Sequence, residues 1–411
     1  MTLKVVLLGK FPPTCGQVST LNLWMAAGLA ERGVEIAVCS DALFPRKRTV
    51  LASAGGKPAD VPKALLPGVE IDYAGHLSEK TFLPFSELGY VSYLAAARET
   101  VLKHRPDVIL SHYLEPYALA GGQLAAEFGI PHVVTHAGSD IVRLCASEPI
   151  RSLYRSILSE AAYFVPKSRI ARDIFGSDAP VFDISPYMPD PRHFGPEEQA
   201  AGGGATDREP LFGFYGKFVH GKGLDKLILA FRAFRKRHGK GRLLLVGGNI
   251  GGGFSMEGLL DPDEDEAVEV RDFVPSWEIP QFLRSLTCLV YTKGGYRVQQ
   301  HAAIVLREAV ACGTPVIATE ESLAGSPSDL LRFGLIRFID ADGSVDELAE
   351  AMAEMAANPP AAPDSLRDYF ADGYGRYVDS WHRCLAEAAE GRAACKARGA
   401  NRPLPVAAPA G

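Results

Sequence analysis

Two lysines in a glycine-rich segment carry the sharpest chemical signal in the sequence. Residues 216–223 read Gly-Lys-Phe-Val-His-Gly-Lys-Gly, follow an apolar run and precede a helical pattern. Lys217 and Lys222 would bring two positive charges to one strand end, where they could stabilise a diphosphate leaving group. The alternative is two solvated lysines in a loop, and we favour anion binding. The segment nearly fits G-x-x-x-x-G-K-[ST], but Gly223 replaces the hydroxyl residue that binds magnesium, which disfavours a phosphate-loop triphosphatase.

A second glycine-rich segment joins the first apolar run to the first helical pattern. Residues 9–16 read Gly-Lys-Phe-Pro-Pro-Thr-Cys-Gly. Glycine permits backbone conformations that a side chain forbids, so amides near Gly16 and at the following helix N-terminus are candidates for phosphate binding. A plain turn between strand and helix explains this segment equally well. The segment does not match G-x-G-x-x-G, which argues against a simple nicotinamide enzyme.

One carboxylate and two histidines complete the candidate site. Glu308 lies in a largely apolar helical pattern, and a carboxylate near a cleft suits bidentate bonding to ribose hydroxyls. Taken alone, Glu308 fits an exposed residue paired with Arg307 better. His112 and His136 end two apolar runs, where an imidazole can donate to a sugar hydroxyl or a phosphate. The Gly-Ser-Asp sequence ending at Asp140 favours function over a structural role for the pair. Their spacing is not that of metal ligands, so we expect no metal.

Short apolar runs alternate with helical patterns along the chain. We predict strands over residues 3–8, 35–40, 108–112, 132–136, 211–215, 242–246, 268–274, 288–291 and 315–319. We predict helices over residues 18–32, with Ser19 or Thr20 near the cap, and over residues 90–104, 117–128, 224–237, 304–311, 345–357 and 366–389. Apolar strands joined by helices indicate an α/β fold with parallel sheets covered on both faces. Ligands bind beyond the carboxyl ends of such strands, so the cleft between domains is the expected site.

One break divides the pattern into two series. Residues 189–209 contain Pro-Asp-Pro-Arg and Ala-Gly-Gly-Gly-Ala, a composition typical of a flexible linker. We therefore predict two Rossmann-like, doubly wound domains over residues 1–188 and 210–365 that face a central cleft. A helix over residues 366–390 is expected to return to the N-terminal domain, and residues 391–411 to form a disordered tail.

Composition excludes several classes of protein. The 411 residues carry 43 Lys and Arg against 49 Asp and Glu, a net charge of −6, which is not the footprint of a nucleic-acid binder. Seven scattered cysteines without a C-x-x-C pair favour a reduced, cytoplasmic compartment. No apolar run is long enough to span a bilayer. The basic triplet at residues 46–48 is more typical of a solvated loop than of a headgroup-binding patch, although peripheral membrane contact stays open. The oligomeric state stays open too.

With these residues assembled, the chain resembles family 4 glycosyltransferases, the large retaining GT-B group, over roughly residues 3–389. Its glycine-rich segment is similar to the "G-R-L … K-G" element, with Lys217 replacing the usual arginine and Lys222 retained. Glu308 and the following Ala-Val-Ala-Cys-Gly-Thr-Pro-Val look like the second glutamate of the E-x7-E motif and its tail. His112, in Leu-Ser-His-Tyr, looks like the active-site histidine of the family.

Two further elements of the N-terminal half carry the resemblance. The turn from His136 to Asp140 resembles the "H-G-x-D" turn and places both residues near the sugar or the acceptor. Gly16 matches the second glycine of the N-terminal loop, although the usual Gly-Gly is Gly16-Gln17 here. The resemblance implies that the acceptor lies mainly on the N-terminal domain.

The resemblance implies a metal-independent, retaining transfer from a nucleotide-diphosphate sugar, with no cofactor. Lys217 and Lys222 would hold the diphosphate together with amides near Ala303 and Ile304, and Gly16 would let the backbone approach it. Glu308 would hold the ribose, and His112 would orient the transferred sugar. Since no apolar anchor is present, we expect a soluble small-molecule acceptor, such as a specialised metabolite or thiol precursor.

One departure from the family pattern affects the donor. Gln300 stands eight residues before Glu308, where the first glutamate of the E-x7-E motif belongs, so the spacing is kept and the charge is lost. The donor sugar or its positioning is therefore expected to be atypical. A lipid or polysaccharide glycosyltransferase, a GT-B epimerase or phosphorylase, and an inert donor-binding relative remain alternatives.

Overall fold

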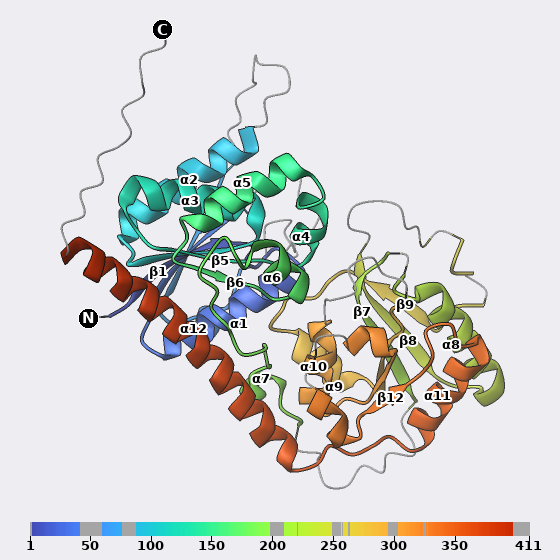
Figure 1. Ribbon diagram of the computed structural model, residues 1–411. Coiled ribbons are helices and arrows are strands. Elements are labelled where there is room, and N and C mark those ends of the chain that lie inside the picture. The colour runs from blue at the N-terminus through green and yellow to red at the C-terminus, as the bar shows by residue number, and fades with distance from the viewer. Residues whose placement is uncertain are drawn as a thin grey trace.

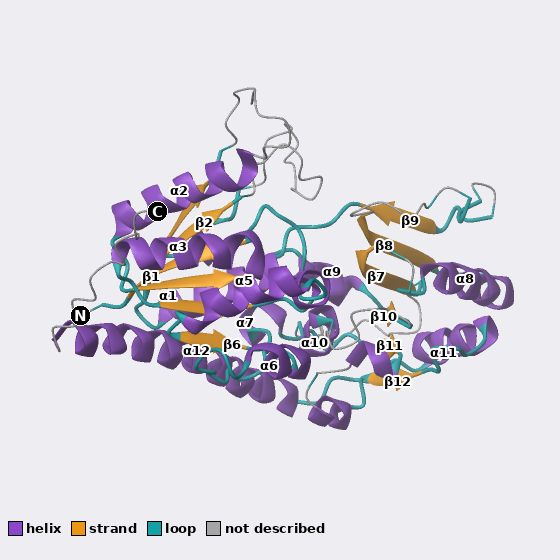
Figure 2. Cartoon of the chain, turned by 45° about the horizontal axis from the view of Figure 1, so that its top comes forward, coloured by secondary structure: helices purple, strands orange, loops and turns teal. Residues whose placement is uncertain are grey.

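The computed structural model describes residues 2–41, 60–75, 88–197, 209–219, 221–248, 256, 258–261, 264–294, 303–323, 326 and 328–397. These residues form two six-stranded parallel sheets (Figures 1 and 2). The first sheet has the order β3-β2-β1-β4-β5-β6, with β1 Lys4–Gly9, β2 Glu35–Ser40, β3 Val69–Tyr73, β4 Val108–His112, β5 His132–Thr135 and β6 Tyr163–Val165. The second has the order β12-β11-β10-β7-β8-β9, with β7 Leu211–Lys217, β8 Arg242–Gly248, β9 Val268–Arg271, β10 Cys288–Tyr291, β11 Val316–Ala318 and β12 Ile336–Phe338. The predicted pair of doubly wound sheets is confirmed.

Helices cover both faces of the first sheet. They are α1 Gln17–Glu31, α2 Leu88–His104, α3 Leu119–Phe128, α4 Ser139–Leu144, α5 Glu148–Ser159 and α6 Arg169–Phe175. Alternate residues of β1 enter different cores: Val5 and Leu7 pack with α1, whereas Val6 and Leu8 pack with residues of α2 and α3. Strands buried on both faces are therefore continuously apolar, which is why the sequence shows them clearly.

Helices also surround the second sheet. They are α8 Leu224–His238, α9 Ile279–Ser285, α10 Ile304–Ala311 and α11 Val345–Ala357. Helices α9 and α10 lie toward the N-terminal half, and α8 and α11 pack together on the far side (Figure 1). The N-terminal end of α10 therefore faces the first sheet across the cleft.

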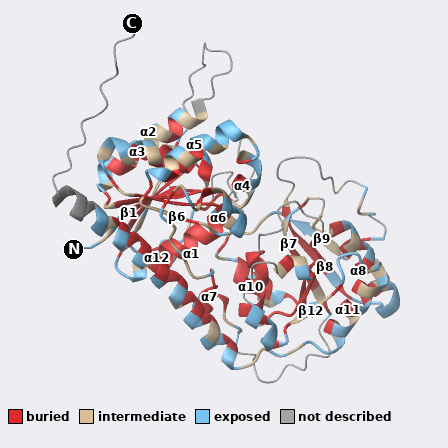
Figure 3. Cartoon of the chain, viewed as in Figure 1, coloured by how far each residue is buried: buried red, intermediate tan, exposed pale blue. Residues whose placement is uncertain are grey.

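A long C-terminal helix connects the two halves. α12, Ser365–Ala397, packs on α10, on the short α7, Pro191–Phe194, and on α1, β4 and β5 (red in Figure 1). Its inner face is buried (Figure 3). The approach to α1 requires Gly28, because a Cβ there would lie 2.5 Å from Val378 Cγ2. The Tyr374 hydroxyl donates to the Trp24 carbonyl at 3.4 Å, which fixes the two helices further.

Parallel register aligns the strand ends that carry the predicted site. Gly9 pairs with His112, and His112 pairs with Thr135, so three neighbouring strands end side by side. His136 follows β5 directly. The loops after these strands therefore gather at one edge of the sheet, which faces the second sheet.

Several predicted boundaries differ from the structure. α1 begins at Gln17, and its N-cap is Gly16 without a side-chain hydrogen bond, so the Ser19 or Thr20 cap is wrong. The Thr20 hydroxyl instead lies 2.9 Å from Ser276 Oγ in the other half. The helix expected from residue 117 starts as a π-helical turn, Leu114–Ala118, interrupted at Glu115.

The remaining differences concern the ends of elements. β9 stops at Arg271, short of the predicted end at residue 274. α7 lies within the segment assigned to a linker, and α12 continues to Ala397, into the segment assigned to a tail. Residues 398–411 lie outside the described chain, as does the basic triplet at residues 46–48. Over the part of the chain that is described, no helix has the length and apolar character needed to cross a membrane.

Candidate active site

Two adjoining pockets occupy the cleft between the sheets. The first, here called the lysine pocket, has a cavity of about 190 Å³ and is lined by Lys217, Lys222 and Glu308 among others. The second, the histidine pocket, has a cavity of about 330 Å³ and is lined by His112 and Lys167 among others. Both are lined by Gln17, Val18, Ala137 and Ile304. A molecule bound in one pocket would therefore touch a molecule bound in the other.

Glycines position Lys222 in the lysine pocket. Gly223 has φ +66°, and a Cβ there would lie 2.2 Å from Thr292 Oγ1, so only glycine fits before α8. A Cβ at Gly216 would lie 2.8 Å from Lys222 Nζ. The ammonium of Lys222 lies 5.2 Å from the ring centroid of Tyr291, a favourable cation–π distance. The glycine pattern seen in the sequence thus serves to hold this lysine at the end of β7.

The lysine pocket gathers further positive charge. Lys10 and Lys293 line it with the two predicted lysines, and Lys293 Nζ lies 3.9 Å from Glu321 Oε1. Burial, followed by the charges of Lys222 and Arg143, lowers the pKa of Lys217. Repulsion of this kind is relieved when an anion binds between the cations.

Two helix N-termini also line the lysine pocket. Residues 16–20 contribute the start of α1, and residues 303–305 contribute the start of α10. Both N-cap residues, Gly16 and Ala303, lack a side-chain capping bond. Amides at such ends are available to an anion, and the helix dipole favours negative charge there. The pocket therefore combines lysines and helix ends suited to a diphosphate.

Glu308 is the buried carboxylate of the lysine pocket. Its exposed fraction is 1%, and every residue of α10 is buried, so an exposed glutamate paired with Arg307 is wrong. Oε1 of Glu308 accepts no hydrogen bond from any residue that the structure describes. Burial raises the pKa of Glu308 to about 8. A buried polar atom without a partner requires an explanation, and ribose hydroxyls would supply the missing donors.

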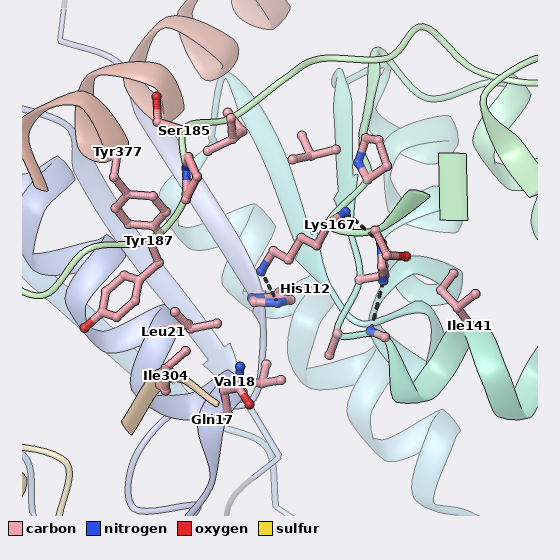
Figure 4. Close-up of a pocket in the computed structure, with 18 of the residues that line it drawn as sticks. Gln17, Val18, Leu21, His112, Ile141, Lys167, Ser185, Tyr187, Ile304 and Tyr377 are labelled. Atoms are coloured by element: carbon pink, nitrogen blue, oxygen red, sulfur yellow. Dashed lines mark hydrogen bonds between the residues drawn. The ribbon is translucent and has the colours of Figure 1, made fainter. Parts of the chain in front are cut away.

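His112 is held at both ring nitrogens. Nε2 lies 2.8 Å from Lys167 Nζ (Figure 4). Nδ1 lies 2.5 Å from Asn22 Oδ1. Asn22 Nδ2 donates to the Lys10 carbonyl at 2.8 Å, which orients the amide so that its oxygen faces the histidine. Nδ1 therefore carries the proton, and Nε2 accepts from Lys167. A sugar hydroxyl that approaches Nε2 meets the lysine first.

His136 and Asp140 organise the backbone instead of offering polar atoms to the cleft. The ring nitrogens of His136 lie 2.9 Å and 2.8 Å from the amides of Gly138 and Lys167. Asp140 is 2% exposed and accepts from three amides, those of Leu114, Ala137 and Ile141. Both carboxylate oxygens of Asp140 thus accept from the backbone, and the side chain does not line either pocket; its contact with sugar or acceptor stays a prediction.

The structure brings most of the predicted site together. The described donor-site residues all line the lysine pocket: Gly16, Lys217, Lys222, Ala303, Ile304 and Glu308. His112 and His136 line the histidine pocket. Gln300 lies outside the described residues. Five residues in or beside the two pockets were not predicted from the sequence: Lys10, Asn22, Lys167, Lys293 and Arg307. Of these, Lys10 stands within the glycine-rich segment 9–16.

The described residues form no cluster of metal ligands. Among the residues that the structure describes, no three His, Cys, Asp or Glu side chains gather as ligands of an ion would. Independence from metal stays a prediction, since it needs a measurement of activity.

Comparisons with known proteins agree with this geometry. Residues 18–180 match the family described as "Glycosyl transferase 4-like domain", and residues 196–372 match "Glycosyl transferases group 1". The D-inositol 3-phosphate glycosyltransferase of Actinosynnema mirum is 26% identical over 387 residues, covering 84% of this chain and 86% of the relative.

Solved structures share the fold over almost the whole length. Sucrose-phosphate synthase from Thermosynechococcus elongatus superposes with a TM-score of 0.61 at 18% identity, covering 97% of this chain and all of that one. The Anabaena protein HepE in complex with UDP-glucose gives a TM-score of 0.59 at 14% identity, covering 96% of this chain and all of that one. With both halves matched and the cleft built as described, the chain belongs to the family 4-like glycosyltransferases of the GT-B superfamily.

Proposed function

We propose that this glycosyltransferase moves a sugar from a nucleotide-diphosphate sugar to a small-molecule acceptor, with retention of anomeric configuration and without a metal. The observation that carries the proposal is the unpartnered, buried carboxylate oxygen of Glu308 in the same cavity as Lys217 and Lys222. A nucleoside diphosphate satisfies all three groups, because its ribose donates to the carboxylate and its phosphates pair with the lysines.

The lining of the cleft supports a mechanism without a protein nucleophile. Among the described residues that line the two pockets, Glu308 is the only carboxylate, and ribose binding occupies it. The retained configuration would then come from a front-face, oxocarbenium-like reaction in which the leaving diphosphate helps to deprotonate the acceptor. Lys217, Lys222 and the two helix N-termini would stabilise the charge that develops on the diphosphate. The protein would otherwise act by holding donor and acceptor in contact.

Two observations support a small acceptor in a reducing compartment. The Actinosynnema mirum relative is named for a phosphorylated inositol, a small molecule. The six cysteines that the structure describes are free thiols, five of them buried, as expected in the cytoplasm. Specialised metabolites and thiol precursors are the acceptor classes that we would test first.

The direct test begins with the nucleotide. Purified protein is screened by thermal shift against UDP, GDP, ADP and dTDP, because a ligand of the folded state raises the melting temperature. The nucleotide sugars of the best ligand are then assayed for release of nucleoside diphosphate, and the product anomer is assigned by NMR. A product of inverted configuration, or the absence of binding by every nucleotide, would contradict the proposal. Turnover that depends on free phosphate would indicate a phosphorylase instead.

A further inference from the structure

The histidine pocket has a lining that donor chemistry does not explain. It is mostly aliphatic and aromatic, with contributions from the N-terminal half, from α10 and from α12 (Figure 4), including Leu21, Ile141, Ile184, Tyr187, Ile304 and Trp381. Apolar side chains around a cavity favour a ligand that carries apolar surface of its own. A free sugar, covered with hydroxyls, would leave much of this lining without a suitable partner.

Charge in the histidine pocket has a single sign. Of the lining that the structure describes, Lys167 and Arg307 are the charged side chains, and none is a carboxylate. Arg307 Nη1 donates to the Tyr187 carbonyl at 2.7 Å, which fixes it to the segment that crosses between the domains. A cation beside apolar groups loses part of its hydration, and an anionic ligand can compensate for that loss.

Lys167 is aimed into the pocket by His112. The lysine follows β6, and its side chain extends across the pocket to the end of β4 (Figure 4). Since Asn22 fixes the tautomer of His112, Nε2 always offers a lone pair to the ammonium. An ammonium has three donors, and one of them is used on the imidazole. The others are positioned for a bound molecule, and solvent reaches the lysine through the open cleft.

Resting on the function proposed above, we propose that the histidine pocket is the acceptor site and that the acceptor has an apolar body and one anionic group, a carboxylate or phosphate, that pairs with Lys167. The position agrees with this assignment, because the pocket meets the lysine pocket at Gln17, Val18, Ala137 and Ile304. An acceptor seated there would present its nucleophilic group toward the donor sugar.

The surroundings of Lys167 favour an anion. The surrounding side chains remove part of the water around the Lys167 ammonium, which lowers its pKa, and the charge of Asp140 opposes that shift. Asp140 itself is bound to three amides and cannot reach the lysine as a hydrogen-bond partner. The other titratable or charged groups of the described lining are His112 from β4, His136 after β5, Arg307 from α10, Tyr187 and Tyr377. A bound anion would stabilise the ammonium form.

The test uses three probes that separate the anion from the apolar body. 4-Hydroxybenzoate carries both, its methyl ester lacks the charge, and glucose 6-phosphate has an anion on a polar body. Ligand-observed NMR on the wild-type protein with saturating UDP should show the acid binding roughly tenfold more tightly than the ester, as expected for a charge-assisted hydrogen bond. Glucose 6-phosphate should bind more weakly than the acid. Lys167→Met should abolish the preference for the acid, and Lys167→Arg should retain part of it.

Arg169 provides a matched control. It follows Lys167 by two residues, is highly exposed and pairs with Asp173, so Arg169→Met removes a nearby charge outside the pocket. This variant should keep the wild-type preference. Equal binding of acid and ester, an undiminished preference in Lys167→Met, or tightest binding by glucose 6-phosphate would each overturn the inference. UDP binding, measured by calorimetry, separates the two proposals. A protein that binds no nucleotide contradicts the glycosyl-transfer proposal, whereas one that binds UDP without discriminating between the acid and its ester contradicts only the acceptor assignment.

Discussion

Arg307 and Glu308 are consecutive residues of α10, yet they line different pockets. Arg307 faces the histidine pocket and donates to the Tyr187 carbonyl at 2.7 Å, whereas Glu308 faces the lysine pocket. Successive residues of a helix point about 100° apart, so one buried helix can supply groups to two neighbouring sites. α10 thereby contributes side chains to both the lysine pocket and the histidine pocket, and through Arg307 it also contacts the segment at Tyr187.

The burial of Glu308 makes its ionised carboxylate unfavourable to the free energy of folding when no ligand is bound. Because the pKa is raised from its ordinary value to about 8, the folded state binds an extra proton between about pH 4.5 and pH 8, and stability falls as the pH rises through that window. Glu308→Gln should therefore raise the melting temperature, by roughly 2–4 °C for each kcal/mol of relieved cost. The difference from wild type should grow from pH 5 to pH 8 and then level off. Thermal melts at several pH values measure this difference in melting temperature, with Glu266→Gln at an exposed position as control. A difference that does not change with pH would contradict the raised pKa of Glu308.

The same carboxylate should link nucleotide binding to pH. Ribose hydroxyls donate to the ionised form, so UDP binding should release protons near pH 7 and strengthen as the pH rises toward 8. Calorimetry in two buffers of different ionisation enthalpy measures the released protons. Glu308→Gln should weaken binding about tenfold to a hundredfold, as expected for loss of charged hydrogen bonds, and should abolish the proton release. Unchanged affinity and proton release would place the ribose elsewhere.

Lys222 should contribute mainly to the transition state. Removing a donor to a developing oxyanion typically costs about 2.7–4 kcal/mol, or roughly a hundredfold to a thousandfold in rate. Lys222→Ala should show a loss of that size in kcat. The control is Lys226→Ala, because Lys226 lies four residues further along the chain, in the first turn of α8, and donates to the Asp340 and Ala341 carbonyls away from the pocket. Steady-state kinetics compare kcat in the two variants. Equal values of kcat would show that Lys222 does not contact the diphosphate.

Local motifs explain why the lysine pocket was predictable. Lys217 and Lys222 stand in one continuous segment, and Glu308 belongs to a recognisable helix, so each signal lies within a few residues. Lys167 gave no such signal, since it follows β6, a strand of three residues. Its contact with His112 exists because the sheet order places β5 between β4 and β6, and a long side chain reaches across.

Asp140 shows that contacts between distant segments are not evident from the sequence. Its position after a strand-end histidine suggested a ligand contact, but its donors are amides from two separate segments: Leu114 after β4, and Ala137 and Ile141 after β5. A carboxylate buried to 2% exposure is held by such amides in place of water. The sequence does not reveal this bond because Leu114 is 26 residues away.

The contact between His112 and Lys167 should make their effects on transfer non-additive. If the imidazole acts by holding the ammonium, His112→Ala and Lys167→Met remove the same interaction. The double variant should then be no slower than the more affected single variant, within about twofold. Affinity for UDP should stay within about twofold of wild type in all three, because neither residue lines the lysine pocket. Kinetics and calorimetry on the four proteins complete the cycle. Multiplicative losses would show that the two residues act independently.

Substitution of Gln300 tests whether this residue helps to recognise the donor sugar. Gln300→Glu introduces the glutamate that is usual in family 4 glycosyltransferases, at the same spacing from Glu308. An amide both donates and accepts hydrogen bonds, whereas a carboxylate only accepts, so recognition of sugar hydroxyls should change. We expect a changed ranking among nucleotide sugars that share one base, while affinity for the bare nucleoside diphosphate stays within about twofold. The control is Gln281→Glu, which adds the same charge to an exposed position of α9. Competition assays with pairs of nucleotide sugars measure the ranking. An identical ranking in both variants would show that residue 300 does not contact the transferred sugar.

The same assays test independence from metal when they include excess chelator. Activity should persist, because the lysines supply the positive charge beside the diphosphate. Activity that returns only with added magnesium or manganese would show that a metal ion, and not the lysines, balances that charge.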